Sequence, residues 1–169
     1  MLVSIENLGY TNIEFGAGCG NFGQIFYPNC FTTDIHDGSK CEICYIDFIC
    51  DVMKPLSWEN RFDIIVMCNP YGYGFKDNED AHYLLGNLAK ILKSGGKIII
   101  IGNDTNQYCK RDFIVKRVVE FNQSQTIQFQ YSTTDVFETK IDYPDYIFYT
   151  TNGFEKTVPN HKTKLYVQK

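Results

Sequence analysis

The sequence lacks the long apolar runs and the charged leader that direct a protein to a membrane or across one. No stretch of its 169 residues approaches the roughly 18 consecutive apolar residues of a membrane-spanning helix. The first residues, MLVSI at 1–5, have neither a positively charged region nor a long apolar segment. These absences predict no membrane association, and we expect a soluble protein located in the cytoplasm.

An excess of positive charge is also lacking. The chain has 16 Lys and Arg against 20 Asp and Glu, a net charge of −4. Domains that bind along the phosphate backbone of nucleic acids are usually basic. Extended nucleic-acid binding is therefore not expected, whereas a single nucleotide, a peptide or a small molecule remains open as a partner.

The 7 cysteines show no regular framework. Their number is odd, and Cys50 and Cys68 lie in apolar runs, where a reduced thiol acts as a small apolar side chain. Cys41 and Cys44 have C-x-x-C spacing, but a zinc site needs two further ligands and the sequence offers no second pair. We predict reduced thiols and no metal site.

The length and the 44% hydrophobic content are those of one globular domain, which we assign to 1–169. Apolar runs and helical periodicity alternate through the first two thirds of the chain. Strands are predicted at 12–15, 30–33, 44–50, 62–68 and 97–101, with helices at 81–92 and 112–121 and further strands at 126–131, 145–150 and 163–167. This order predicts an α/β, Rossmann-like three-layer domain. Its sheet would be mostly parallel, with about seven strands and an antiparallel C-terminal edge.

A glycine-rich turn, GAGCG at 16–20, follows the first predicted strand, and polar residues follow the later ones: Asp34, Asp51, Asn69 and Asn103. The carboxyl ends of parallel strands meet at one edge of a sheet, so these residues predict a ligand site there. Gly18, Gly20 and Gly23 also satisfy the G-x-G-x-x-G dinucleotide pattern. However, a nicotinamide site has no evident use for the acid at Glu14, whereas a cofactor that carries an ammonium group does.

The chain resembles the class I S-adenosylmethionine-dependent methyltransferases over roughly 10–105. The resemblance rests on IEFGAGCG at 13–20, Asp34, CDV at 50–52, FDII leading to CNPY at 68–71, and the helix and turn at 88–96. It implies S-adenosylmethionine as cofactor and S-adenosylhomocysteine as product. The cofactor-binding residues it implies are Glu14, Phe15, Gly16, Ala17, Gly18, Gly20, Asp34, Ile35, Cys50, Asp51, Val52 and Asn69.

The resemblance also implies individual roles. The glycines let backbone pass the methionine and ribose portions, and Glu14 acts on the ammonium group directly or through water. Asp34 accepts hydrogen bonds from the ribose hydroxyls, and Asp51 accepts from the adenine amino group. A local structural role is the alternative for both acids, an Asx turn for Asp34 and a helix cap for Asp51.

The methyl acceptor is sought after the fourth strand, in NPYGYGF at 69–75. Methyltransferases that act on planar amines carry Asn or Asp, two prolines and an aromatic residue there. Tyr71 replaces the second proline here, which puts that chemistry in doubt. We predict Asn69 and Tyr71 as catalytic residues. Tyr71, Tyr73 and Phe75 could line a pocket for a flipped base or pack as a loop on a helix.

The acceptor stays open between a nucleobase, a protein side chain and a small molecule. Oxygen ligands at Asn69, Asn103 and Asp104 would suit metal-assisted O-methyl transfer, but such a site usually has more carboxylates. Two alternatives remain, a non-catalytic S-adenosylmethionine-binding or interaction domain and a methylase-type toxin module of a larger protein. The short segments at 1–11 and 35–44 predict a minimal domain with few lid helices. One sheet face would then be open or covered by a partner chain or domain. The basic residues at 110–111 and 116–117 are predicted to form a solvated face.

Overall fold

The structure, a computed structural model, describes residues 9–68, 70, 74–103, 106–109, 111–124, 129–131, 148–150, 153–155 and 161–168. At 101–103, 111, 130–131 and from 148 onward the description covers the backbone alone. Asn69, Tyr71, Tyr73 and Asp104 lie outside the described residues.

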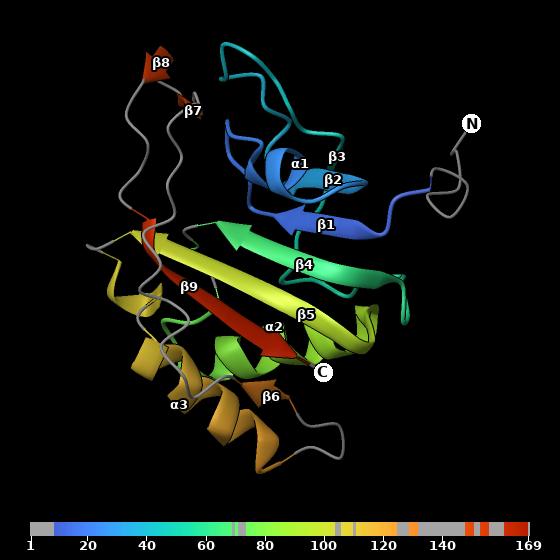
Figure 1. The fold of residues 1–169 in the computed structure, drawn as a ribbon, viewed down its shortest axis with the longest axis vertical. Coiled ribbons are helices and arrows are strands. Elements are labelled where there is room, and N and C mark those ends of the chain that lie inside the picture. Colours follow the sequence, from blue (N-terminus) through green and yellow to red (C-terminus); the bar gives the residue numbers. More distant parts are fainter. Residues whose placement is uncertain are drawn as a thin grey trace.

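A single large sheet organises the fold, in the order β3-β2-β1-β4-β5-β9-β6 (Figure 1). Its strands are β1 (Asn12–Phe15), β2 (Cys30–Asp34), β3 (Phe48–Ile49), β4 (Phe62–Cys68), β5 (Leu92–Asn103), β6 (Gln130–Tyr131) and β9 (His161–Gln168). The first five are parallel, whereas β9 pairs antiparallel with both β5 and β6. A separate hairpin joins β7 (Phe148–Thr150) and β8 (Gly153–Glu155). The parallel sheet confirms the predicted Rossmann-like α/β class.

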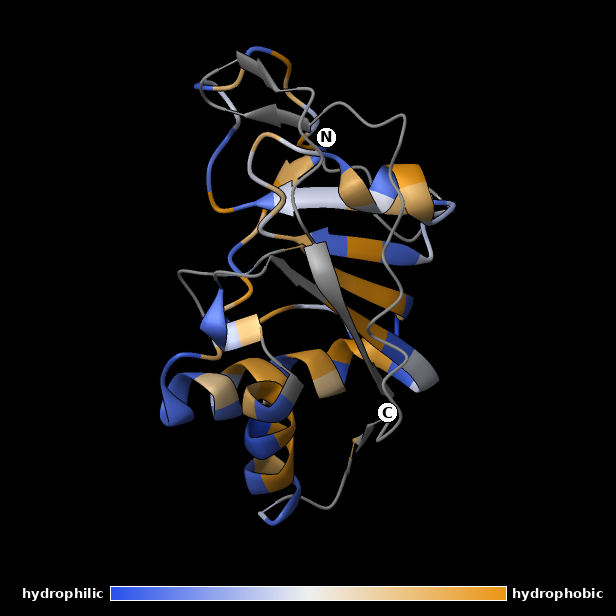
Figure 2. Cartoon of the chain, turned by 60° about the vertical axis from the view of Figure 1, so that its left-hand side comes forward, coloured by the Kyte–Doolittle hydropathy of each residue, from blue (hydrophilic) through white to orange (hydrophobic). Residues whose placement is uncertain are grey.

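The central strands are apolar on both faces because helices lie on both sides. On one face, Ile65 and Met67 of β4 pack with α2 (Asn78–Ile91) and α3 (Arg111–Asn122). On the other face, Val66 of β4 and Ile99 of β5 pack with α1 (Phe22–Phe26). Figure 2 shows the hydrophobic colour concentrated along the central strands and on the helix beside them. Such two-sided burial explains the nearly continuous apolar run of β4.

The helix α2 begins earlier than predicted because Asp77 caps it. The Asp77 carboxylate accepts hydrogen bonds from the backbone N–H groups of Glu79 and Asp80. A capped N-terminus satisfies donors that the first turn leaves unpaired. The helix therefore starts at Asn78, three residues before the first residue of the apolar pattern. A short 3-10 helix, η2 (Gln107–Cys109), precedes α3.

The third strand is much shorter than the predicted 44–50. The Thr32 N–H donates to the Asp47 carboxylate at 2.8 Å, and the Asp47 N–H donates to the Thr32 carbonyl at 2.8 Å. The Asp47 side chain thus accepts the hydrogen bond that a backbone carbonyl of β3 would otherwise accept from β2. Backbone pairing between β2 and β3 starts only at Phe48. The segment between β2 and β3 contains no helix among these described residues, as its length predicted.

β1 and β4 are parallel neighbours in the sheet. After β1 the chain adds β2 and β3 toward one edge, and after β4 it adds β5 toward the other edge, so the strand order reverses between β1 and β4. In open α/β sheets, ligands bind outside the carboxyl ends of the strands at this point. None of the helices in the described part of the chain combines the length and apolar character that crossing a bilayer requires.

Candidate functional site

The glycine turn after β1 needs two left-handed backbone positions. Gly16 has a φ of 67° and Gly18 a φ of 62°, a region that residues with a Cβ rarely adopt. The turn is held by the Ala17 N–H, which donates to the Thr33 carbonyl at 3.0 Å, and by the Gly20 N–H, which donates to the Ala17 carbonyl. The turn is therefore tied to the end of β2, where the predicted ribose acid lies.

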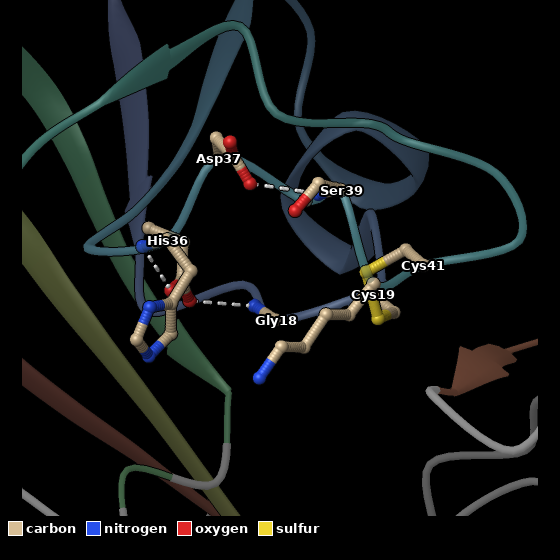
Figure 3. A pocket seen from close by; sticks show the side chains of 9 residues that line it. Gly18, Cys19, His36, Asp37, Ser39 and Cys41 are labelled. Atoms are coloured by element: carbon tan, nitrogen blue, oxygen red, sulfur yellow. Dashed lines mark hydrogen bonds between the residues drawn. A yellow bond between two sulfur atoms is a disulfide. The ribbon is translucent and has the colours of Figure 1, made fainter.

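Asp34 joins the glycine turn to the segment that follows β2. One carboxylate oxygen accepts from the Gly18 N–H at 2.8 Å and the other from the His36 N–H at 3.0 Å (Figure 3). The second contact is the Asx turn that the sequence left as an alternative. Because each carboxylate oxygen has two lone pairs, these contacts leave acceptor capacity for a ligand.

Glu14 of β1 is fully buried against the start of α1. Its Oε2 accepts from the Gly23 N–H at 2.6 Å, whereas Oε1 has no hydrogen-bond partner among the described residues. Burial raises the pKa of Glu14 to about 7, an effect that the Gly23 hydrogen bond reduces and the nearby Asp34 charge reinforces. A buried acceptor without a donor is costly, and a ligand or a water that donates to Oε1 would relieve it.

A pocket of about 190 Å³ opens between the glycine turn and the segment after β2. It is lined by Gly18, Cys19, Asp34, His36, Asp37, Gly38, Ser39, Lys40 and Cys41. Figure 3 shows the Asp37 carboxylate facing the Ser39 N–H, which donates to it at 2.8 Å. The residues from His36 to Cys41 were not predicted as site residues, and their only signal was their place directly after Asp34.

Two exposed apolar residues neighbour Asp34, one next to it in the chain and one as its partner on β3. Ile35 is 55% exposed, and Ile49, the β3 partner of Asp34, is 61% exposed. The Cys50 N–H donates to the Asp34 carbonyl, and burial raises the pKa of the Cys50 thiol to about 11. An acceptor beside exposed apolar surface suits a ribose joined to a flat base.

Asp51 makes local contacts. Its carboxylate accepts from the Met53 N–H at 2.9 Å across a turn at 52–53. No helix follows this turn within the described range 54–68, so the helix cap that the sequence left as an alternative is not formed. The side chains of Val52 and Phe15 are buried in the apolar core, so only their backbone can face a ligand. Of the predicted cofactor residues, Gly18 and Asp34 line the pocket, whereas Glu14 is buried against Gly23 and Ile35 is exposed next to Asp34.

The prediction that all seven cysteines are reduced thiols is wrong for two of them. Cys19 of the glycine turn and Cys41 of the segment after β2 form a disulfide, with their Cα atoms 5.4 Å apart. The other five cysteines form no disulfide. Nothing in the spacing of Cys19 and Cys41, which are 22 positions apart, indicates this pair.

The predicted acceptor segment is described only at its ends. Asn106 is buried and donates to the Pro70 carbonyl at 3.1 Å. Phe75 is fully buried in the core, so it packs and does not line an open aromatic pocket. Asn69 and Tyr71, the predicted catalytic residues, and Tyr73 lie outside the described residues.

Arg117 holds the far end of that segment, so the prediction of a solvated face is wrong for this residue. Its guanidinium donates to the Phe75 carbonyl at 3.1 Å and to the Lys76 carbonyl at 2.9 Å. It also lies over the Phe113 ring and pairs with Glu120. Its neighbour Lys116 is exposed, as predicted.

Known proteins share this architecture but little of the sequence. No protein-family model and no curated protein matches the chain. The solved CurJ carbon methyltransferase aligns over 95% of this chain and 48% of its own, with 13% identity and a TM-score of 0.54. The chain has the fold of a methyltransferase.

Two further solved structures are similar at lower scores. The N-methyltransferase NodS from Bradyrhizobium japonicum WM9, in complex with S-adenosyl-L-homocysteine, aligns over 94% of this chain and 76% of its own at 16% identity, with a TM-score of 0.48. An S-adenosylmethionine-dependent methyltransferase from Mesorhizobium loti aligns over 56% of this chain at 17% identity, with a TM-score of 0.43. The chain spans 47% of the length of that protein.

Proposed function

We propose that the protein binds S-adenosylmethionine and transfers its methyl group to an acceptor. The observation that supports this most strongly is the arrangement of the glycine turn, Asp34 and Glu14 at the point where the sheet order reverses. The fold is shared with a methyltransferase, and Asp34 and Glu14 offer acceptor groups that suit two parts of this cofactor.

The fit can be followed along the ligand. Asp34 retains lone pairs for the two ribose hydroxyls, and the exposed Ile35 and Ile49 offer apolar surface to the adenine ring. The unpartnered Oε1 of Glu14 requires a donor, which the ammonium group or a water bound to it would supply. The pocket of about 190 Å³ is smaller than the 300–1,000 Å³ of typical ligand sites, so in this form it has room for only one portion of the cofactor.

S-adenosylmethionine supplies an activated methyl group that a nucleophile displaces in line. The chain contributes alignment of the reacting groups and a dry polar site. We propose that Asn69 and Tyr71 contact the acceptor. They stand in the sequence on either side of Pro70, whose carbonyl is held by Asn106 directly after β4. The acceptor is a nucleobase, a protein side chain or a small molecule.

The test is transfer of a labelled methyl group from S-adenosylmethionine to pools of nucleic acid, protein and small molecules. Tyr71→Ala should abolish transfer while S-adenosylhomocysteine binding is retained. Tyr83→Ala, which removes an exposed tyrosine on α2, is the matched control and should leave transfer unchanged. Binding of the cofactor without transfer to any pool would favour the non-catalytic binding domain.

A further inference from the structure

The Cys19–Cys41 disulfide forms part of the wall of the candidate cofactor pocket. Both cysteines line the pocket, one from the glycine turn and one from the segment after β2 (Figure 3). The bond therefore connects the two segments between which the proposed cofactor would enter.

The outer part of the segment after β2, 38–44, makes only short-range hydrogen bonds besides this disulfide. Within the described range from Gly38 to Cys44, the Cys41 N–H donates to the Gly38 carbonyl at 2.9 Å, and the Cys44 thiol contacts the Asp37 carbonyl at 3.4 Å. The neighbouring Ser39, Lys40, Glu42 and Ile43 are exposed. Segments with few buried contacts open at low free-energy cost. The disulfide is thus the covalent link that keeps this segment against the glycine turn.

The disulfide-bonded pocket is also small for the proposed ligand, because about 190 Å³ is below the usual range for a nucleoside-sized site. We propose, on the basis of the function proposed above, that Cys19–Cys41 is a reversible modification site whose reduction opens the pocket to S-adenosylmethionine. The disulfide form is the low-affinity state, and the dithiol form is the binding state.

The reductant is a low-molecular-weight thiol. Cys41 is partly exposed whereas Cys19 is buried, so the incoming thiolate attacks Cys41 Sγ and Cys19 leaves as a thiolate that takes up a proton. A second thiolate attacks the external sulfur of the mixed disulfide and releases Cys41. Overall, one protein disulfide and two thiols give two protein thiols and one external disulfide.

The thiols of Cys30, Cys68 and Cys109, which are buried or half-buried, do not compete for this chemistry. Burial raises the pKa of the Cys30 and Cys68 thiols well above the ordinary value and that of Cys109 to about 12. Protonated, buried thiols are poor nucleophiles. Cys44 is exposed and free, and it lies in the same segment as Cys41, so it provides the matched control.

The test compares the affinity for S-adenosylhomocysteine, by calorimetry, of the disulfide-bonded protein and of the protein reduced with dithiothreitol. Counting thiols in denaturant defines the two states, with five free cysteines expected before reduction. Reduction should raise the affinity about tenfold, within the usual range of coupling between sites. Cys44→Ser should keep this response, whereas the Cys19→Ser, Cys41→Ser double variant should bind like the reduced protein with or without dithiothreitol.

A reciprocal measurement needs no variant. Because linkage is symmetric, S-adenosylhomocysteine should shift the disulfide equilibrium toward the dithiol by the same factor at a fixed thiol-to-disulfide ratio. Equal affinity in both states, or seven titratable thiols before reduction, would overturn the switch and leave the proposed function standing. Absence of binding in both states would overturn the proposed function itself, and the switch with it.

Discussion

Replacing Glu14 by Gln tests how much the buried carboxylate lowers the free energy of unfolding and whether that carboxylate contributes to ligand binding. Glu14 is fully buried, and burial raises its pKa from 4.5 to about 7. A raised carboxyl pKa means that the folded protein holds this proton after the unfolded chain has lost it. The stability associated with the proton is therefore present below pH 4.5 and is lost as the pH rises toward 7.

The magnitude follows from the two pKa values. The rise in pKa from 4.5 to about 7 corresponds to about 3 kcal/mol of unfolding free energy in total. Most of this free energy is lost between pH 5 and pH 8. Gln carries no titratable proton, so Glu14→Gln should gain about 2 to 3 kcal/mol relative to wild type over this interval. The buried amide adds a constant penalty, and the informative quantity is the pH dependence.

Urea unfolding of both proteins at pH 5, 6, 7 and 8 measures this difference. Glu42→Gln, the same substitution at an exposed side chain, shows what loss of one negative charge does by itself. If Oε1 receives the ammonium group, wild type should also bind S-adenosylhomocysteine more tightly at pH 8 than at pH 6, and Glu14→Gln should not show this step. Parallel unfolding curves for wild type and Glu14→Gln would refute a buried carboxyl with a raised pKa.

Three further substitutions test the packing around the site by thermal or urea unfolding. Gly23→Ala should destabilise by about 1 to 3 kcal/mol, because its Cβ would lie 2.7 Å from a sulfur and 2.9 Å from a carboxylate oxygen; no loss would mean that α1 can move away. Arg117→Ala should cost about 1 to 3 kcal/mol, whereas Lys116→Ala should stay within about 0.5 kcal/mol, and equal effects would contradict the anchoring role. Asn106→Ala should cost about 1 to 3 kcal/mol by leaving the Pro70 carbonyl without this donor, and a neutral result would show that water replaces it.

The bounds of a strand can be predicted from the sequence where burial alone decides the structure. The bounds of β1 and β4 were predicted as observed: β4 is a nearly continuous apolar run in the sheet centre, and β1 is buried at all four positions directly before the glycine turn. The prediction failed for β3, where the Asp47 side chain occupies a position on the β2 ladder. A polar side chain that replaces backbone pairing leaves no periodic signal in the sequence.

The candidate site was predictable to a similar extent. The glycine turn and Asp34 follow strand ends, so the topology brings them together. Arg117 was predicted to face solvent because charged side chains usually do. In the structure its guanidinium donates hydrogen bonds to two backbone carbonyl groups of a segment distant in the sequence. Cys41 reached the pocket wall through a contact between segments far apart in the chain, which spacing does not encode.

The central claim is tested most directly by calorimetric titration of the reduced protein with S-adenosylmethionine, S-adenosylhomocysteine and NAD. Both adenosyl sulfur compounds should bind and NAD should not. Asp34→Ala should lose about tenfold or more in affinity, since hydrogen bonds to a charged group contribute about 1.5 to 3 kcal/mol each. Asp63→Ala, at the opposite end of β4, should bind like wild type. Binding of NAD, or no binding of either adenosyl compound, would contradict the account.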